Sequence, residues 1–300
     1  MDERRLRYFL AVVDEGGVTR AAERVRVAQP SLSQALRAFE RELGVELFHR
    51  VGRGLQLTAA GEALVGPARQ ALRSIIEARA AVTGVAQLSA GSLQLAALAT
   101  LAVDPMAPLI GRFRGRHPGV RVDVLEPDTA AGVGALVRRG ECELGAADLP
   151  LAGEDLITRP LGEQELLLVF APDAPLADGR PLEPQVLSEI QFVVAPPGTS
   201  TRLLLEETLA SVGVAPRIGV QTGAREAIVP LVLAGAGAAL LPSPLAREAQ
   251  RRGATIRSAT PPITRKVGLV HRRDPLSAAA SAFLLLAAAQ AATPMKESRP

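Results

Sequence analysis

The 300-residue chain contains little sulfur and few aromatic side chains, and these shortages exclude several kinds of site. Its one cysteine, Cys142, excludes a disulfide bond within the chain and is expected to be a small core residue at the start of a strand. The three histidines, His49, His117 and His271, are widely separated and show no metal-ligand spacing. Aromatic residues make up 3% of the chain, which disfavours a stacking pocket for a large aromatic ligand. We therefore expect no metal site and no cofactor.

Long apolar runs are also missing. No stretch reaches the ~20 residues that cross a membrane, and the chain opens with charged residues, where a secretory signal would carry a cleavable apolar segment. We therefore expect a cytoplasmic protein with no membrane partner.

The sequence motifs of common enzymes are absent as well. Two glycine pairs, Gly132-Val-Gly134 and Gly235-Ala-Gly237, imitate the start of a dinucleotide-binding loop, but neither is followed by the third glycine. Both lie beside or inside helical stretches instead of between a strand and a helix, and we expect turns there. The chain contains no Gly-x-Ser-x-Gly, no Walker loop and no His-Glu-x-x-His sequence. The sequence therefore does not predict an enzyme.

Positive charge is concentrated in the first part of the chain. Residues 1–90 contain 13 arginines and 10 acidic residues, a net charge of +3, whereas residues 91–300 contain 21 basic and 21 acidic residues. The whole formal charge of +3 therefore lies in the N-terminal part. This asymmetry favours a polyanionic partner for that segment alone.

Residues 18–40 predict two short helices joined by a tight turn. Apolar residues of the second helix recur at helical spacing and should form one buried stripe: Leu32, Ala35, Leu36 and Phe39. The opposite face carries glutamine, serine and arginine, whose side chains hydrogen-bond to base edges and phosphates of DNA. The simpler alternative is a solvated surface helix.

The neighbouring segments favour the DNA-binding interpretation. The preceding helix has its own apolar stripe over residues 21–25, and an upstream helix over residues 6–13 supplies a third. Downstream, residues 47–58 alternate apolar and polar side chains around a Gly-Arg-Gly turn, which predicts a two-stranded wing. Arg50 and Arg53 on this wing are placed to meet the DNA backbone or the minor groove.

With these segments in order, residues 1–88 resemble the winged helix-turn-helix and linker helix of a LysR-type transcriptional regulator. The resemblance rests on stretches in the family's order and spacing: Arg7-Tyr-Phe-Leu-Ala-Val-Val, Thr19-Arg-Ala-Ala-Glu-Arg, Ala28-Gln-Pro-Ser-Leu-Ser, the run from Leu36 to Arg50, and Leu57-Thr-Ala-Ala-Gly-Glu. It continues more weakly through residues 113–120, 136–147 and 231–242. The resemblance implies transcriptional regulation through a dyad-symmetric operator in double-stranded DNA, with RNA polymerase as a further partner.

By this resemblance residues 1–60 form the DNA-binding domain. Pro30 fits the first position of its second short helix, where a missing N–H costs nothing. The residues expected to contact DNA lie on the two short helices and the wing: Thr19, Arg20, Gln29, Pro30, Ser31, Ser33, Gln34, Arg37, Arg50 and Arg53.

Residues 61–88 predict one long linker helix with a heptad-like apolar seam. The seam steps by three and four residues through Gly61, Leu64, Ala68, Ala71, Ile75, Ala78, Val82 and Val85. In the resembled family two such helices pack antiparallel, which implies a homodimer or homotetramer with dimerisation through Leu64, Ala68, Ala71, Ile75 and Val82. The alternative is an intramolecular core helix. Dimerisation is favoured because these small side chains bury little area alone.

From residue 91 short apolar strands alternate with helices, the pattern of an α/β domain. Strands are expected at 92–99, 120–126, 143–147, 165–171, 191–195, 217–221, 237–241 and 266–271, and helices at 104–117, 130–140, 200–213, 224–235, 244–252 and 275–292.

The chain is thus predicted to be an α/β multidomain protein. Its residues 91–300 resemble the two-lobed, periplasmic-binding-protein-like (type II) effector domain of the same family, with lobe one at 91–161 plus 267–300 and lobe two at 162–266. A periplasmic solute-binding protein would share this fold, but it needs a signal peptide and has no use for residues 1–88.

A small-molecule effector is expected in the cleft between the lobes, where strand ends and helix N-termini meet. The candidate contacts are hydroxyl residues that follow strands or precede helices: Thr100, Thr129, Thr199, Ser200 and Thr222. Such a set suits an anion, and carboxylate metabolites are common effectors in the resembled family. Arg202 or Arg225 would add a positive charge if either turned inward. The alternative for each hydroxyl is an ordinary helix N-cap.

Overall fold

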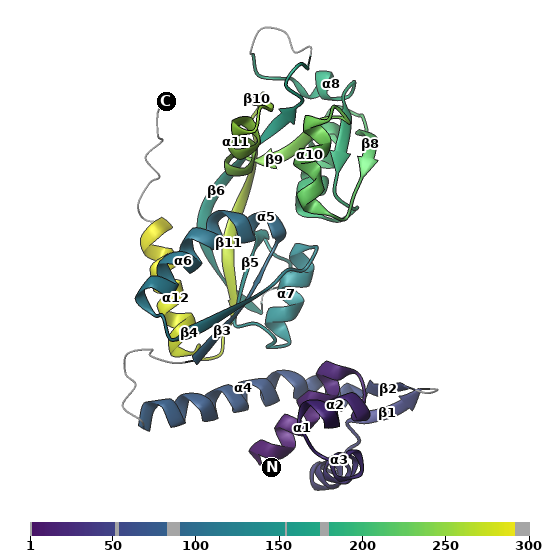
Figure 1. The fold of residues 1–300 in the computed structure, drawn as a ribbon, viewed down its shortest axis with the longest axis vertical. Coiled ribbons are helices and arrows are strands. Elements are labelled where there is room, and N and C mark those ends of the chain that lie inside the picture. The colour runs from purple at the N-terminus through teal and green to yellow at the C-terminus, as the bar shows by residue number, and fades with distance from the viewer. Residues whose placement is uncertain (1, 52–53, 83–90, 154, 175–179, 292–300) are drawn as a thin grey trace.

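The computed structural model describes residues 2–51, 54–82, 91–153, 155–174 and 180–291. Three parts follow one another along its longest axis: a small helical unit with one long helix, and then two α/β lobes (Figure 1). Within the described ranges, none of the helices combines the length and the apolar composition that a membrane span requires.

The N-terminal unit is a winged helix-turn-helix, as the sequence predicted. Its elements are α1 (Glu3–Glu15), α2 (Val18–Arg24), α3 (Gln29–Leu43) and the antiparallel strands β1 (Phe48–Val51) and β2 (Gly54–Leu57). Asp2 caps α1 by accepting a hydrogen bond from Arg5 N at 2.8 Å. Gly16 and Gly44 end α1 and α3 in the left-handed conformation that glycine favours.

Apolar side chains of these helices meet in one core. Leu32, Leu36 and Phe39 of α3 are buried, as expected, whereas Ala35 is half-buried. Phe9 of α1 packs on Phe48 of the wing, with ring centroids 5.4 Å apart. The core therefore holds α3 by one face, and the opposite face of the helix points away from it.

The linker helix α4 (Ala59–Val82) leaves this core and runs below the first lobe in the view of Figure 1. It passes through Pro67 as one helix, and the predicted linker segment 83–88 lies outside the described residues. Gly66 of α4 meets Gly140 of the first lobe so closely that a Cβ on Gly140 would lie 3.4 Å from Gly66 Cα. Two residues without side chains therefore bring the linker helix against the effector domain.

A seven-stranded mixed sheet carries the two lobes, in the order β10-β6-β11-β5-β3-β4 with β9 paired to β6. Its strands are β3 (Gly91–Ala97), β4 (Val120–Leu125), β5 (Leu144–Leu149), β6 (Leu156–Phe170), β9 (Ala239–Pro242), β10 (Thr255–Arg257) and β11 (Ile263–Arg272). The second lobe also contains a parallel pair, β7 (Gln191–Val194) and β8 (Arg217–Gln221).

Helices cover the sheet of each lobe. The first lobe has α5 (Ala99–Leu101), the π-helical η1 (Ala102–Met106), α6 (Ala107–Arg116), α7 (Ala130–Arg138) and α12 (Ala278–Ala291). The second lobe has α8 (Pro184–Leu187), α9 (Ser200–Ala210), the 3-10 turn η2 (Arg225–Ala227), α10 (Ile228–Leu233) and α11 (Ser243–Arg251).

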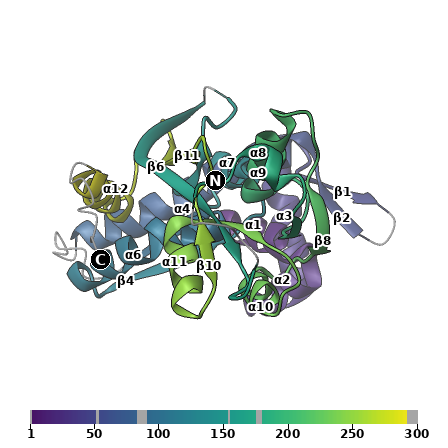
Figure 2. The ribbon, with the colours of Figure 1, turned by 90° about the horizontal axis from the view of Figure 1, so that it is seen from above.

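The two lobes have separate apolar cores joined by two long strands. Phe113 and Phe283 pack edge to face in the first core, and Phe192 is buried in the second. The antiparallel strands β6 and β11 run side by side through both lobes (Figure 1; Figure 2 shows them from above), and their register shifts between Val267 and Gly268. The hydrogen-bonded pair of β6 and β11 therefore connects the two lobes and sets their relative position.

Several elements differ from the sequence expectations. β6 and β11 begin at Leu156 and Ile263, so both are longer than the strands expected at 165–171 and 266–271. In each strand, polar residues lie between the part in one core and the part in the other, and they interrupt the apolar pattern. The short elements α8 and β10 were not predicted, because three or four residues are too few to show a period.

Proline and glycine account for two further differences. The helix expected at 104–117 is preceded by η1, in which Asp104 is extended ahead of Pro105, a residue that disfavours helix before it. Gly132 and Gly134 lie inside α7, so the turn expected there is wrong. A Cβ on Gly134 would approach Leu151 Cδ2 to 2.9 Å, which shows that this glycine permits close packing.

Candidate functional site

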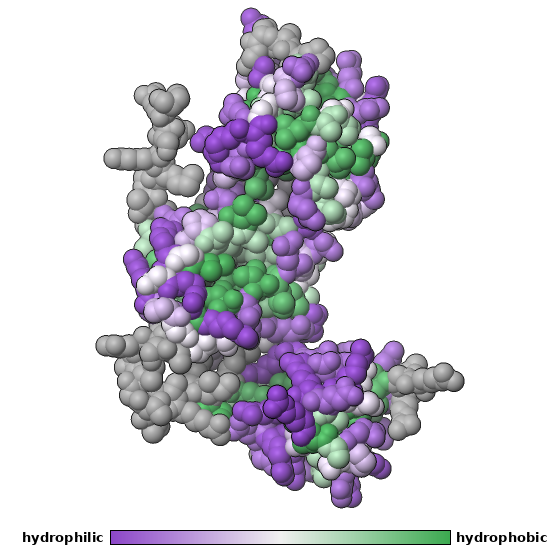
Figure 3. Space-filling view, in the orientation of Figure 1, coloured by the Kyte–Doolittle hydropathy of each residue, from purple (hydrophilic) through white to green (hydrophobic). Residues whose placement is uncertain are grey.

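The outward face of α3 is polar. Every expected contact residue on this helix reaches the surface, with Ser33 half-buried and the others exposed: Gln29, Pro30, Ser31, Gln34 and Arg37. The helix begins at Gln29, so Pro30 is its second residue and not its first. Hydrophilic residues dominate the N-terminal unit in the space-filling view (Figure 3). This face of α3 is therefore not packed beneath another described part of the chain.

The preceding helix and the wing flank α3. Thr19 and Arg20 are exposed in the first turn of α2. Glu40 of α3 fixes the approach to the wing, since its Oε1 accepts hydrogen bonds from the N–H groups of Leu47 and Phe48 at 2.9 and 3.2 Å. Arg53 lies outside the described residues, and only the backbone of Arg50 is described, within β1.

The first half of the linker seam packs inside the chain. Ala68 is 1% exposed in the helix-turn-helix core, and Leu64 and Ala71 are half-buried against the same core. The intramolecular alternative therefore describes this half of the seam, and Ala68 has no surface left for a second subunit. Ile75 is half-buried, and only the backbone of Val82 is described.

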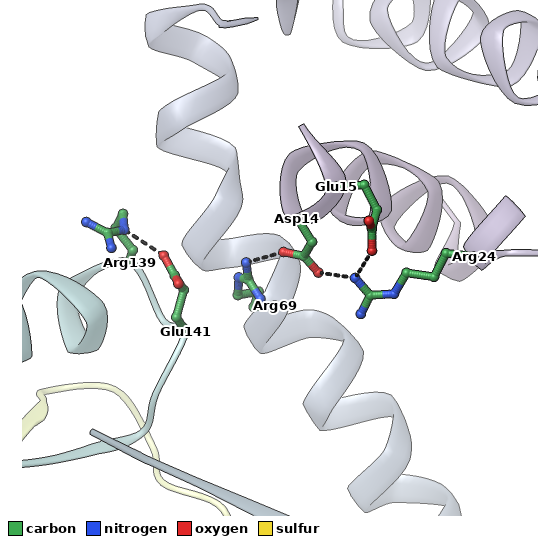
Figure 4. A network of polar contacts seen from close by, with 6 residues as sticks. All are labelled: Asp14, Glu15, Arg24, Arg69, Arg139 and Glu141. Atoms are coloured by element: carbon green, nitrogen blue, oxygen red, sulfur yellow. Dashed lines mark hydrogen bonds and ion pairs between the residues drawn. The ribbon is translucent and has the colours of Figure 1, made fainter. Parts of the chain in front are cut away.

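Ion pairs hold the linker helix on the N-terminal unit (Figure 4). Arg69 of α4 contacts Asp14 of α1 at 2.6 Å. Arg24 of α2 joins the same group, 3.4 Å from Asp14 and 3.0 Å from Glu15. Polar contacts as well as an apolar core therefore link the first half of α4 to α1 and α2.

A cavity of about 430 Å³ lies between the two lobes. Its apolar lining includes Leu98 and Val103 of the first lobe and Ala195, Ile228, Leu241 and Leu245 of the second. Its hydroxyl groups belong to Thr100, Thr199, Ser200 and Thr201. Its charged residues are mostly exposed: Glu126, Asp128, Arg225, Glu226, Glu248 and Arg252. A cavity that combines apolar side chains with hydroxyl and charged groups is typical of a small-molecule site.

The structure brings three of the five expected effector contacts together. Thr100, Thr199 and Ser200 line the cavity. Thr129 instead caps α7, because its Oγ1 accepts a hydrogen bond from Gly132 N at 3.0 Å. Thr222 accepts from Ala224 N at 3.1 Å, in an ordinary local turn. For these last two, the local capping alternative describes the structure.

The two candidate arginines behave differently. Arg202 pairs with Glu206 along α9 and does not line the cavity. Arg225 lines it and reaches from the second lobe to the first, where its Nη2 lies 2.8 Å from Asp128 Oδ1. Its charge is therefore already paired within the chain.

The structure adds an arginine that the sequence reasoning missed. Arg265 of β11 is 7% exposed, and its guanidinium donates hydrogen bonds to Thr100 Oγ1 at 2.9 Å and to Ser200 Oγ at 2.7 Å. Gln164, opposite it on β6, accepts from Arg265 Nε at 2.9 Å. Asp148 Oδ1 lies 3.2 Å from Arg265 Nη1. One guanidinium thus contacts both lobes and both connecting strands.

The electrostatics at Arg265 follow from its burial. Burial lowers the pKa of the guanidinium, and the nearby charges of Asp148 and Asp104 act to raise it. Arginine nevertheless remains protonated in proteins, so a permanent positive charge lies behind the cavity. The sequence held a signal for this, since Ile263, Arg265 and Val267 stand at strand spacing and share one buried face.

Within the described ranges, no group of three histidine, cysteine or acidic side chains is arranged to hold a metal ion. Cys142 is fully buried in the first core just before β5, where the sequence placed it.

Two family models match the chain. The model described as the LysR substrate binding domain matches residues 86–292, and the model described as a bacterial regulatory helix-turn-helix protein of the lysR family matches residues 4–62. Together they cover both the N-terminal unit and the two lobes.

Named relatives span nearly the whole chain. The chain is 32% identical over 291 residues to the HTH-type transcriptional regulator IlvR of Caulobacter vibrioides, covering 91% of this chain and 93% of the relative. It is 31% identical over 286 residues to a RuBisCO operon transcriptional regulator of Allochromatium vinosum, covering 93% of each. A full-length OxyR variant from Pseudomonas aeruginosa has a similar fold, with a TM-score of 0.76, 24% identity and coverage of 100% of this chain and 99% of that one.

Proposed function

The chain belongs to the LysR family of bacterial transcriptional regulators, and from this premise we propose which of its surfaces carry the regulation. It is a DNA-binding regulator with an effector-binding domain, and its relatives are named as regulators and not as enzymes. We assign operator reading to α3, with Thr19, Arg20 and the wing as flanking contacts. The observation that carries this assignment is the exposed face of glutamine, serine and arginine on a helix whose other face is buried.

The second half of α4 pairs two subunits. Ile75 keeps part of its apolar surface outside the N-terminal core, and Val82 continues the seam beyond it. Pairing there brings two α3 helices to a dyad-symmetric operator. Two dimers form a homotetramer that presents four such helices to adjacent half-sites and contacts RNA polymerase in the cytoplasm.

The interlobe cavity binds a small anionic effector. Thr199, Ser200 and Thr201 stand at the start of α9, where the first N–H groups of a helix have no partner within it. Such a helix start favours a carboxylate or phosphate. Effector binding changes the spacing of the dimers, and a coupling of about 1–3 kcal/mol between effector and DNA would suffice to alter operator binding or bending.

Single substitutions on α3 test the operator assignment. Gln29→Ala and Arg37→Ala should each weaken binding to an operator selected from random-sequence DNA by about 1–3 kcal/mol and relax base preference at one position. Arg112→Ala, an exposed cation on α6, is the matched control and should leave affinity and selectivity unchanged. Equal weakening on every DNA sequence would show that these side chains contact only phosphate.

The cavity assignment is tested by removing its hydroxyl groups. A protein carrying both Thr100→Val and Thr199→Val should lose its response to effector in a gel-shift assay while its operator affinity without effector stays the same. Thr222→Val is the control, because this hydroxyl lies in a local turn outside the cavity. Simultaneous loss of response and of operator binding would indicate misfolding and count against the assignment.

A further inference from the structure

A carboxylate of the chain itself lies directly behind the cavity. Asp148, near the end of β5 in the first lobe, reaches Ser200 at the start of α9 in the second, where its Oδ2 accepts a hydrogen bond from the hydroxyl. Its Oδ1 is buried without a hydrogen-bond partner, although Arg265 Nη1 lies 3.2 Å away. The carboxylate is therefore held between a hydroxyl and a guanidinium.

Arg265 and Ser200 together bind a carboxylate within the chain. The Arg265 side chain is 5% exposed, and it donates to both Ser200 Oγ and Thr100 Oγ1. Those two hydroxyl residues also line the cavity, so the guanidinium lies one layer behind its wall. A buried guanidinium is costly without a counter-charge. Asp148 supplies the larger share of that counter-charge, and Asp104, which accepts a hydrogen bond from Gln164 Nε2 at 3.1 Å, supplies a smaller one.

We propose that Asp148 is an internal ligand of the effector cleft. Its carboxylate contacts Arg265 and Ser200 at the position that the carboxylate of a bound effector takes. This inference rests on the proposed effector-binding function, and it identifies Asp148 as the group that the effector replaces. Because Arg265 and Ser200 already bind the carboxylate of Asp148, they can bind an effector carboxylate of the same geometry in its place.

The exchange has a consequence for the lobes. Replacing one carboxylate by another keeps the charge of Arg265 neutralised, so that no unpaired buried cation results. Asp148 belongs to the first lobe and Ser200 to the second, and its departure breaks a direct contact between β5 and α9. Effector binding therefore replaces a fixed link between the lobes by a link through the ligand.

The ion pairs that Arg225 makes across the cleft do not serve this purpose. Arg225 contacts Asp128 at 2.8 Å and Glu126 at 3.6 Å, but these acidic side chains are 82% and 54% exposed. Water and salt screen such a pair, which typically contributes less than about 1 kcal/mol. The Arg265–Asp148 pair, whose side chains are 5% and 24% exposed, is better shielded from water and is the pair for which an effector carboxylate competes.

Thermal unfolding of the full-length Asp148→Ala protein tests the proposal, with formate as the probe. The substitution leaves Arg265 in place and makes room for a small carboxylate. We expect the variant to melt below the wild type, and sodium formate at constant ionic strength to raise its Tm saturably by several degrees, because a ligand bound only by the folded state stabilises it. The wild type, whose site is filled by Asp148, should show no such rise.

Asp155→Ala is the matched control, because Asp155 also pairs with an arginine, Arg138, at 2.7 Å but on the surface. Its Tm should not respond to formate. An equal response in the wild type or in the Asp155→Ala protein, or no response in Asp148→Ala, overturns the proposal.

A second variant keeps the test decisive if the alanine protein does not fold. Asp148→Asn preserves the size of the side chain and removes its charge. By titration calorimetry, hexanoate should bind this variant at least about tenfold more tightly than the wild type, a difference of about 1.4 kcal/mol. Equal or weaker binding overturns the proposal. Failure of the proposed function would be detected by a different experiment, as an effector response that persists in the Thr100→Val, Thr199→Val protein. That outcome would not change the formate result.

Discussion

Gly61 lies where α4 crosses the segment that leads into the wing. A Cβ at this position would lie 2.2 Å from the carbonyl oxygen of Leu47 and 2.8 Å from Leu57 Cδ2. Leu47 is not free to move aside, because its N–H donates a hydrogen bond to Glu40. The missing side chain therefore sets how closely the linker helix approaches the wing.

Gly61→Ala should lower the free energy of unfolding by about 1–3 kcal/mol, the usual cost of forcing an extra methyl into a packed site. Urea denaturation of the full chain measures the change. Gly111→Ala in α6 is the control, since no atom lies within 4 Å of its added Cβ. That substitution should stabilise the protein by about 0.5–1 kcal/mol. Effects of the same sign at both positions would contradict the argument.

The sequence could place hydroxyl residues near the cleft but could not decide which of them face it. Thr129 and Thr222 bond to backbone N–H groups two or three residues away, as hydroxyls beside a helix start or turn commonly do. Thr100 and Ser200 are instead held by Arg265, which is 165 and 65 residues distant in the chain. A local pattern carries no information about such a partner.

At the scale of single elements, α4 lies in two environments along its length. Its first half is part of the helix-turn-helix core, with Ala68 1% exposed, and Ile75 lies farther along, where the helix leaves that core. Stability and subunit pairing should therefore respond to different positions.

Ala68→Asp should lower the Tm of the N-terminal unit sharply, because it places an unpaired carboxylate in an apolar core. Ile75→Asp should leave that Tm nearly unchanged and lower the mass measured by analytical ultracentrifugation below that of the wild type, because pairing through α4 is lost. Circular dichroism supplies the Tm for both proteins. A mass for Ile75→Asp equal to that of the wild type would place the subunit interface elsewhere.

Helix α1 should show a dependence on pH through its N-cap. The hydrogen bond from Arg5 N is the main cause that holds the pKa of Asp2 below its usual value, and the Arg5 charge acts in the same direction. A carboxyl group with a lowered folded-state pKa stabilises the fold above its unfolded pKa, about 4, and this contribution is lost as the pH falls through the lowered value.

The difference in Tm between the wild type and Asp2→Asn should accordingly be largest near neutral pH and shrink as the pH falls below about 4. Thermal unfolding from pH 3 to pH 7 measures it. A difference that grew toward acid would mean that the cap is not ionised in the folded protein.

Elements whose apolar residues form one continuous helical or strand pattern could be predicted from the sequence. Elements that pass from one apolar core to another could not. The buried stripe of α3 shows helical spacing in the sequence, and its burial follows. β6 and β11 each pass from one core to the other, so their apolar residues belong to two separate patterns with polar residues between them. Arg265 lies in such a stretch, which is why the expected strand began one residue after it.

For the whole molecule, the separation of charge has a measurable effect. All of the net charge of +3 lies in residues 1–90, and the rest of the chain is neutral. If about six to ten phosphates are neutralised per dimer, log affinity should fall with log salt at a slope of roughly −5 to −9. Fluorescence anisotropy with labelled operator at several salt concentrations gives this slope.

Arg20→Ala should reduce the magnitude of that slope by about one for each contacted phosphate, whereas Arg121→Ala on β4 should not change it. Both side chains are exposed, so the comparison isolates their positions. Equal changes at both residues would indicate a general charge effect.

The order of the three parts could be predicted from their motifs, but their contacts could not. Each part has its own periodic pattern, which identifies it without reference to its neighbours. Gly66 and Gly140 lie in different parts, and glycine in a helix or after one has several explanations in a sequence. Their meeting depends on the path of the whole chain.

That glycine contact also limits what the effector domain can transmit to the DNA-reading helices. A Cβ at Gly140 would lie 2.6 Å from Arg272 Nη1 and 3.4 Å from Gly66 Cα, so a methyl group there would displace either the guanidinium or the linker helix. Any movement of the effector domain that reaches those helices must therefore proceed without bringing the two main chains closer at this point.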